Sequence, residues 1–377
     1  MNTLALKKEG SLAVVEHGIH WRQLWSLAAL YASIIVGWIA YKNYQPKLLM
    51  QFGFTDFAFP LMVTQGVILM LTPLVAGKLG DRYRVEKGHR LPIISSGISL
   101  AAMVFMAVAF TLLGNPGAVF KWILPVLIIL WLISMSVFTS PALSTMELFT
   151  PIEKLPTAMA VLTITGNLVH ALEPVIVHII DYVGAPITFI LGGAVVFVSG
   201  YALKRNSLSL FKVNGKEERN PLQQEASVSA YGFVFFVGLS VGFVSTILFY
   251  LFPVMLTQKP DTFFRSEVTY FIVWILILSA LISWPVSGIV KRFGTSRSFW
   301  VGLALSIVSA LGVYFFTSTI VILIVLVIFA LAFTSLSVSS LPLAIKRAAY
   351  HEKVFCVGLF FSGVAIPEAI CEAWLVF

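Results

Sequence analysis

Charge is scarce in this 377-residue chain, and acidic charge is the scarcest. Only 11% of the residues are charged, with 17 acidic against 25 basic side chains, whereas 59% are hydrophobic and the mean hydropathy is +0.94. Soluble globular domains carry about 25% charged residues, so this composition excludes that class. The chain is therefore predicted to be an all-α integral membrane protein, in which each helix uses about 20 apolar residues to cross the bilayer.

The chain also lacks the motifs of nucleotide-driven or hydrolytic chemistry. It contains no GxxxxGK[ST], HExxH or GxSxG pattern. We therefore predict no enzymatic activity, cofactor or metal site. Its two cysteines, Cys356 and Cys371, share one apolar run, where a helix holds them roughly 22 Å apart and excludes a disulfide between them.

Apolar runs predict eleven transmembrane helices. No apolar leader with a cleavage site occurs in residues 1–20, so we expect a short cytoplasmic tail before the first helix. The predicted spans lie near residues 23–46, 57–77, 91–113, 121–148, 156–180, 184–203, 230–256, 267–290, 298–316, 318–343 and 354–377.

Basic residues gather in alternate connections between these spans. With the N-terminus in the cytoplasm, 20 of the 25 lysines and arginines lie on the cytoplasmic side. This bias is the positive-inside signal of a multi-pass protein, here of the plasma or inner membrane. Basic loops at the surface of the lipid bilayer explain the net charge of +8, so no nucleic-acid partner is needed to account for it.

The longest polar segment, residues 204–229, follows the sixth span. Its composition is typical of a flexible linker between domains. We therefore predict an N-terminal six-helix bundle over 1–203, a cytoplasmic linker over 204–229 and a C-terminal bundle of about five helices over 230–377.

Short stretches recur in the two halves. "PKLLMQ" (46–51) resembles "PVMLTQ" (253–258), and "FTSPALSTMELF" (138–149) resembles "FTSLSVSSLPLA" (333–344). Each pair ends equivalent spans, which favours a duplicated fold of two pseudo-symmetric bundles. The alternative is the enrichment in small residues that helix packing in membranes produces in any case.

The densest charge cluster carries a resemblance to a known family. "GKLGDR" (77–82) resembles the loop signature of the major facilitator superfamily, and "DRYRVEKGHRLPII" (81–94) resembles its extended form in the sucrose/proton symporter branch, the glycoside-pentoside-hexuronide cation symporters. Residues 37–53, 138–151 and 340–370 are also similar to that branch. The resemblance implies a twelve-helix transporter, so the twelfth helix is expected to be missing from this chain.

The function that this resemblance implies is secondary active transport by alternating access. The substrate would be a small molecule, a sugar or a related polar metabolite, moved by a proton or cation gradient. Two other functions stay open: export of amphipathic compounds or drugs, and a transport-inactive sensor or scaffold, which the missing twelfth helix would favour. The sequence fixes neither the direction of transport nor the oligomeric state.

The charge cluster is also expected to act as a gate. A carboxylate and guanidinium groups at the mouth of a transporter form charge-assisted hydrogen bonds with the end of a neighbouring helix. Asp81 would hold the cytoplasmic gate shut in one state, while Arg82 and Arg90 hold the loop. Gly77 and Gly88 belong to the same predicted gate. A topology signal alone would explain the arginines but not the aspartate.

Few ionisable residues lie within the predicted spans, where a charge costs roughly 2.5–3.5 kcal/mol and is normally functional. Lys42 and Glu173 have similar predicted depths, which allows an ion pair between them. His170 lies one helical turn before Glu173, and Asn167 lies one turn before His170. This spacing predicts a proton relay. A structural polar patch near the outer mouth would explain these residues equally well.

Glu368 and Glu372 share one face of the last predicted span. Both carboxylates could bind a proton or cation; we predict that Glu372 instead reaches the outer interface beside Trp374, and the role of Glu368 stays open. Glu147 is expected to be solvated or to pair with the gate. Three further polar residues can bind a polar ligand or serve helix packing, namely Tyr41, Asn43 and Gln65.

Overall fold

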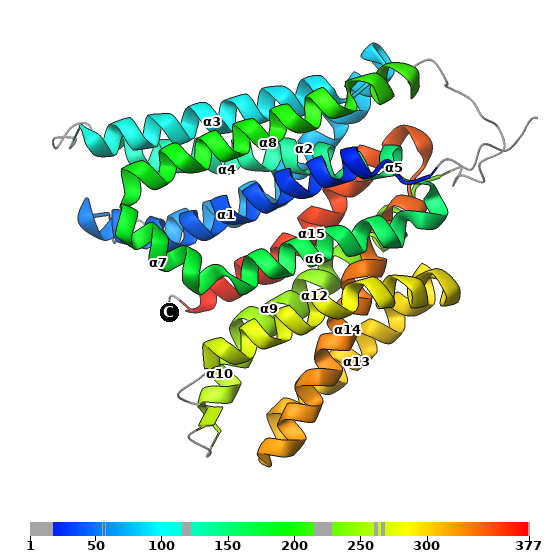
Figure 1. The fold of residues 1–377 in the computed structure, drawn as a ribbon. Coiled ribbons are helices and arrows are strands. Elements are labelled where there is room, and N and C mark those ends of the chain that lie inside the picture. Colours follow the sequence, from blue (N-terminus) through cyan, green and yellow to red (C-terminus); the bar gives the residue numbers. More distant parts are fainter. Residues whose placement is uncertain are drawn as a thin grey trace, which may run out of the picture.

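The computed structural model describes most of the chain, in residues 18–54, 56, 58–114, 122–214, 228–259, 263–264 and 268–375. In these ranges the chain forms helices joined by short turns (Figure 1). Most of the predicted tail, the linker from 215 to 227 and Phe377 lie outside the described residues.

The N-terminal half supplies the first six spans. Its fifth span is two helices, α6 and α7, which meet at a bend of 54°. Pro174 at the start of α7 contributes to this break because proline cannot donate the backbone hydrogen bond of a continuous helix. The helices are α1 (Trp21–Gln51), α2 (Ala58–Lys87), α3 (Leu91–Leu113), α4 (Ile123–Ser144), α5 (Met146–Phe149), α6 (Leu155–Ala171), α7 (Glu173–Val183) and α8 (Ala185–Asn214), with a 3-10 turn η3 (Ile152–Lys154).

The C-terminal half supplies five spans. Its first span contains a π-helical segment, η4 (Ile247–Leu251), between two α-helices. The helices are α9 (Tyr231–Thr246), α10 (Phe252–Thr257), α12 (Val268–Phe293), α13 (Thr295–Phe315), α14 (Thr319–Lys346) and α15 (Lys353–Leu375), with a 3-10 turn η5 (Tyr350–Glu352).

The predicted all-α membrane fold is confirmed. Among the described residues, ten helices are long and apolar enough to cross a membrane, or eleven when the bent pair α6 and α7 counts as one span. The eleven predicted spans correspond to these eleven units.

Two helices extend further than the apolar pattern indicates. α2 continues through Lys87, so Gly77, Asp81 and Arg82 lie on its last turns and not in a loop. α8 continues to Asn214, eleven residues into the segment interpreted as a linker. Hydropathy falls where charged residues carry the chain out of the apolar layer. The helix continues there because Arg, Glu and Lys also favour helix. α2 stops only at Gly88, whose φ of +73° turns the chain toward α3.

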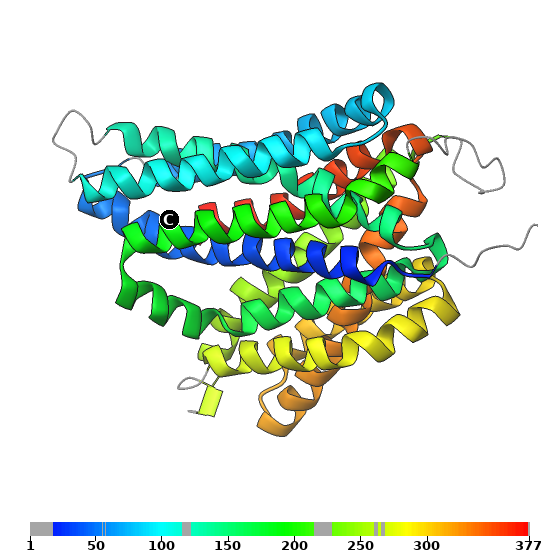
Figure 2. The same ribbon diagram turned by 45° about the horizontal axis from the view of Figure 1, so that its top comes forward.

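The helices form two groups with a shared interface (Figures 1 and 2). On one side α3 packs along α8 and α4, and α1 along α8; on the other side α13 packs along α14, and α12 along α14. The groups meet where α15 packs along α2 and where α12 packs along α6. This interface encloses the candidate site.

The helical assembly has two distinct ends. The charged end carries the α2–α3 turn, α5 and the start of α15, on the right of Figure 1. The Lys42 end is the opposite one, with the ends of α1 and α10. The related stretches 46–51 and 253–258 both lie at the Lys42 end, as a duplicated fold requires.

Candidate functional site

A cavity of about 600 Å³ lies between the two groups of helices. Residues of α1, α2, α4, α6 and α7 line it on one side, and residues of α9, η4, α14 and α15 line it on the other. Aromatic and aliphatic side chains form most of its wall, together with a set of hydroxyl groups, Ser136, Thr139, Ser140, Thr163, Ser245, Thr246, Ser337 and Ser340. Ionisable side chains of the wall are Lys42, His170, Glu173, Tyr250 and Glu368.

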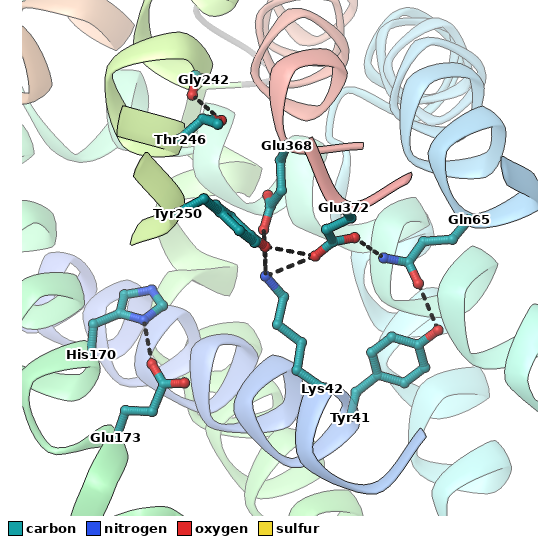
Figure 3. A network of polar contacts seen from close by, with 10 residues as sticks. All are labelled: Tyr41, Lys42, Gln65, His170, Glu173, Gly242, Thr246, Tyr250, Glu368 and Glu372. Atoms are coloured by element: carbon teal, nitrogen blue, oxygen red, sulfur yellow. Dashed lines mark hydrogen bonds and ion pairs between the residues drawn. The ribbon is translucent and has the colours of Figure 1, made fainter. Parts of the chain in front are cut away.

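The ammonium group of Lys42 is the centre of a network that joins the two bundles (Figure 3). It forms an ion pair with Glu368 of α15 and lies 3.3 Å from Oε1 of Glu372. It also donates a hydrogen bond of 3.1 Å to the hydroxyl of Tyr250. The side chains of Lys42 and Glu368 are 40% and 39% exposed, so water reaches this network.

The network continues to α2 and back to α1. Tyr250 donates to Glu372 at 2.7 Å, and the Gln65 amide donates to the other carboxylate oxygen at 3.0 Å. Tyr41 in turn donates to the Gln65 carbonyl at 2.8 Å and stacks on Trp131. Helices α1, α2 and α15 and the π-helical segment are therefore linked by one chain of polar contacts.

Two sequence predictions about these charges are wrong. Lys42 does not take Glu173 as its partner, because its ammonium pairs with two carboxylates of α15. Glu372 points into the network and not toward an interface beside Trp374, which is itself exposed. Equal depth in the membrane had allowed the Lys42–Glu173 pair, but depth does not fix the direction in which a helix presents a side chain.

His170 and Glu173 meet at the break between α6 and α7. Nδ1 of His170 lies 3.7 Å from Oε2 of Glu173, and the His170 ring packs against Phe249 of η4. Both residues line the cavity, as the proton-relay prediction requires. Asn167 also lines the cavity, but its amide donates to Ser279 of α12 at 2.7 Å, which makes it a contact between the bundles.

Asn43 lies away from this cavity. Its amide donates to Asp181 of α7 at 2.9 Å, and Lys47 binds the same carboxylate at 2.7 Å. These contacts join α1 to α7, so Asn43 serves packing and not ligand contact. Of the three polar candidates, Gln65 lines the cavity, whereas Tyr41 is buried behind it.

At the charged end, Asp81 binds the first turn of α15. Its two carboxylate oxygens accept hydrogen bonds from the backbone N–H groups of Val354 at 3.1 Å and Phe355 at 2.8 Å. The first N–H groups of a helix have no partner within the helix, and their dipoles favour a negative charge. The helices can approach because Gly77 has no side chain: a Cβ there would lie 2.7 Å from Cα of Phe355.

Glu147 is the centre of a second ion network at this end. Its carboxylate lies 2.6 Å from Nη2 of Arg90, 3.5 Å from Nη1 of Arg84 and 3.1 Å from Nζ of Lys353. The side chains of Arg90 and Glu147 are only 1% and 8% exposed. Burial lowers the pKa of the Arg90 guanidinium, and the neighbouring Glu147 carboxylate opposes that shift. Lys353 belongs to α15, so this network also crosses between the bundles.

Arg82 does not hold the gate. It is exposed and pairs with Glu86 one turn along its own helix, at 2.6 Å. Arg84 takes the expected role, because it lies on the same face as Asp81 and donates to the carbonyl of Tyr350 at 3.1 Å. Interpreting residues 78–87 as a continuation of the helix would have revealed that face, since residues three apart lie together.

Tyr250 and Lys353 were also missed. The π-helical segment carries Tyr250, and no sequence pattern used here indicates such a segment. Lys353 had counted only as one of the basic residues of a loop, although it begins α15 beside Glu147. Among the described residues, no group of three or more histidine, cysteine, aspartate and glutamate side chains is arranged to hold a metal ion.

Comparison with known proteins identifies the fold. The sequence profile of the Major Facilitator Superfamily matches residues 27–370. The chain belongs to the Major Facilitator Superfamily. It is therefore a multi-pass membrane protein of a superfamily of secondary transporters, and the resemblance found in the sequence is confirmed at that level. The narrower resemblance to sucrose/proton symporters stays a prediction.

Solved structures share this superfamily's arrangement of helices. The human organic anion transporter MFSD10 (TETRAN) matches with a TM-score of 0.65 and 14% identity, over 94% of this chain and 92% of that one. A bacterial homologue of the iron transporter ferroportin in the outward-facing state matches with a TM-score of 0.68 and 15% identity, over 94% and 91%. At these identities the likeness shows the fold alone. No curated protein sequence matches the chain significantly.

Proposed function

We propose that this protein is a proton-coupled secondary transporter that moves a small organic solute by alternating access. One observation carries the proposal: the cavity between the bundles has charges accessible to water at its Lys42 end, whereas the inter-bundle ion pair Lys353–Glu147 at the other end is buried. Membership of the Major Facilitator Superfamily supports this class of function. The arrangement corresponds to a state that is open at one end.

The charged end acts as the closed gate in this proposal. Asp81 and Glu147 each bind α15 by charge-assisted hydrogen bonds or ion pairs. Such hydrogen bonds stabilise a structure by about 1.5–3 kcal/mol each, which is enough to bias an equilibrium between two states and small enough to be broken. The bias of 20 to five basic residues supports a cytoplasmic location for this end.

The coupling proton is best placed on the carboxylates that bind Lys42. Protonation of Glu368 would remove its attraction for Lys42 and so weaken the contact of α15 with α1. His170 and Glu173, expected from the sequence to carry the proton, lie within the bent span of one bundle. Their protonation would change no ion pair between the bundles, so we assign the coupling to Glu368.

The solute is better described as amphipathic than as a sugar. A sugar site needs many polar groups around the ring, because every hydroxyl that loses water must find a partner. Here Ile34, Ile35, Leu69, Met135 and Leu162 contribute apolar wall, and the aromatic rings add to it. The lining therefore favours the amphipathic solute over the sugar that the resemblance to symporters implies.

Proteoliposomes with a trapped pH-sensitive dye test the proposal. Solutes from panels of sugars, organic acids and lipophilic amines are added outside, and the internal pH is recorded. We expect at least one panel member to drive proton movement, and Glu368→Gln to abolish that movement while counterflow of the same solute continues. Transport of a solute that never moves protons would contradict the coupling, and the absence of any solute-dependent flux would favour a sensor or scaffold.

A further inference from the structure

We infer that the cavity selects an amphipathic organic cation, such as a protonated or quaternary amine, whose charged group binds between Glu173 and Glu368. This inference rests on the proposed transport function and narrows its substrate class. It follows from the charge balance, the aromatic wall and the volume of the cavity.

The charge balance is the first argument. Lys42 is the lysine of the cavity wall, and it already pairs with both Glu368 and Glu372. Glu173 is a third carboxylate, 42% exposed, and the imidazole of His170 lies 3.7 Å from it. Lys42 and the three carboxylates together carry two negative charges in excess, and at least one remains whichever form His170 takes, so an added cation would reduce the excess.

The aromatic wall is the second argument. The faces of aromatic rings attract cations, most strongly where water is excluded. Trp38, Phe249 and Phe360 supply aromatic rings on the wall, so an ammonium group with an apolar body can lie against them.

The volume indicates the size of the ligand. A cavity of about 600 Å³ accommodates one drug-sized molecule.

Other ligand classes fit less well. An organic anion would approach Glu173 and Glu368 with a single lysine that two carboxylates already occupy. A neutral sugar would leave the excess charge in place. A divalent metal would need a cluster of ligands that the described residues do not provide. The cation is therefore the class that both the charge and the wall favour.

Binding to the purified full chain in lipid nanodiscs tests the inference with three probes. Tetraphenylphosphonium and tetraphenylborate have closely similar shapes and opposite charges, and phenyl glucoside is an aromatic neutral sugar. Dissociation constants are measured by equilibrium dialysis against empty nanodiscs. We expect tetraphenylphosphonium to bind at least about ten-fold more tightly than either other probe.

Two variants locate the charge. Glu173→Gln and Glu368→Gln should each weaken tetraphenylphosphonium binding by about ten-fold, whereas Glu153→Gln, an exposed carboxylate of η3 outside the cavity, should leave it unchanged. Glu368→Gln strands Lys42 and can reduce folding, so melting temperature and elution volume are recorded for each variant. Among the described residues, Glu173 forms no ion pair with a lysine or arginine, so Glu173→Gln is the deciding variant if Glu368→Gln does not fold.

The outcomes separate this inference from the transport function. Binding of tetraphenylborate or phenyl glucoside as tight as that of tetraphenylphosphonium, or phosphonium binding that Glu173→Gln leaves unchanged, would overturn the cation selectivity. Neither result would contradict alternating access. That part of the proposal is tested separately, by measuring distances between the bundles without any ligand.

Discussion

The carboxylate of Asp81 accepts a hydrogen bond from the backbone N–H of Phe355 at 2.8 Å, which joins the end of α2 directly to the first turn of α15. Asp81→Asn keeps the shape but turns an amide N–H toward one of the two backbone N–H groups. We expect a loss of about 1–3 kcal/mol of gate stability and a strong fall in transport rate, with little change in ligand affinity. Transport and equilibrium binding are measured on the same preparation.

Two arginines on the same helix supply a matched comparison for that gate. Arg84→Gln should slow transport, because Arg84 binds Tyr350 and lies beside Glu147. Arg82→Gln should leave transport close to normal, because Arg82 is exposed and contacts its own helix. If Arg82→Gln were the more damaging of the two, the assignment of the gate contacts would be incorrect.

Glu147 is expected to be the most sensitive single charge for stability. Glu147→Gln leaves Arg90, Arg84 and Lys353 without their shared carboxylate in a buried site. Removing one partner of a buried ion pair costs about 3–5 kcal/mol, and this should appear as a lower free energy of unfolding in detergent. Glu153→Gln, on the exposed turn that follows, should stay within about 0.5 kcal/mol of the parent. Equal stability of the two variants would contradict the network.

Gly77 and Gly288 form a second matched pair. A Cβ at Gly77 would lie 2.7 Å from Cα of Phe355, whereas no heavy atom lies within 4 Å of a Cβ at Gly288 of α12. Gly77→Ala should therefore cost about 1–3 kcal/mol by forcing α2 and α15 apart. Gly288→Ala should be neutral or stabilise the protein by up to about 1 kcal/mol. Thermal melting of both variants tests this, and a neutral Gly77→Ala would refute the close approach.

The orientation is tested by cysteine labelling in intact cells. Ser209 near the end of α8 and Gln258 after α10 are exposed at opposite ends, while Cys356 and Cys371 are buried. An impermeant reagent added outside should label Gln258→Cys and not Ser209→Cys, because the basic bias predicts that the end of α8 lies in the cytoplasm. The reverse pattern would invert the orientation.

Much of the fold was predictable because it depends on hydrophobicity along the chain. Long apolar runs with few charges have one stable arrangement in a bilayer, the helix, so the eleven spans follow from composition. The ends of α2 and α8 were not predictable in this way, because charged residues extend a helix beyond the apolar layer as readily as they end a span. Gly88 marks the true end of α2.

The candidate site was predictable in its members but not in its pairs. Lys42, Glu173 and Glu368 were identified because a charge within a span is costly and therefore informative. Which of them meet depends on how the helices are rotated and packed, and that information is distributed over all contacts of α1 and α15. Tyr250 depends in addition on the π-helical segment, which changes the face that span seven presents to the cavity.

The central claim, that the bundles exchange between states open at opposite ends, is tested most directly by two pairs of spin labels. One pair, at Lys87 and His351, spans the charged end, and the other, at Gln51 and Gln258, spans the Lys42 end; all four positions are exposed. Distances are measured by pulsed electron–electron double resonance in the parent, in Asp81→Asn and in Arg82→Gln. We predict that Asp81→Asn lengthens the charged-end distance and shortens the Lys42-end distance together, while Arg82→Gln changes neither. A change at one end without the opposite change at the other would contradict alternating access.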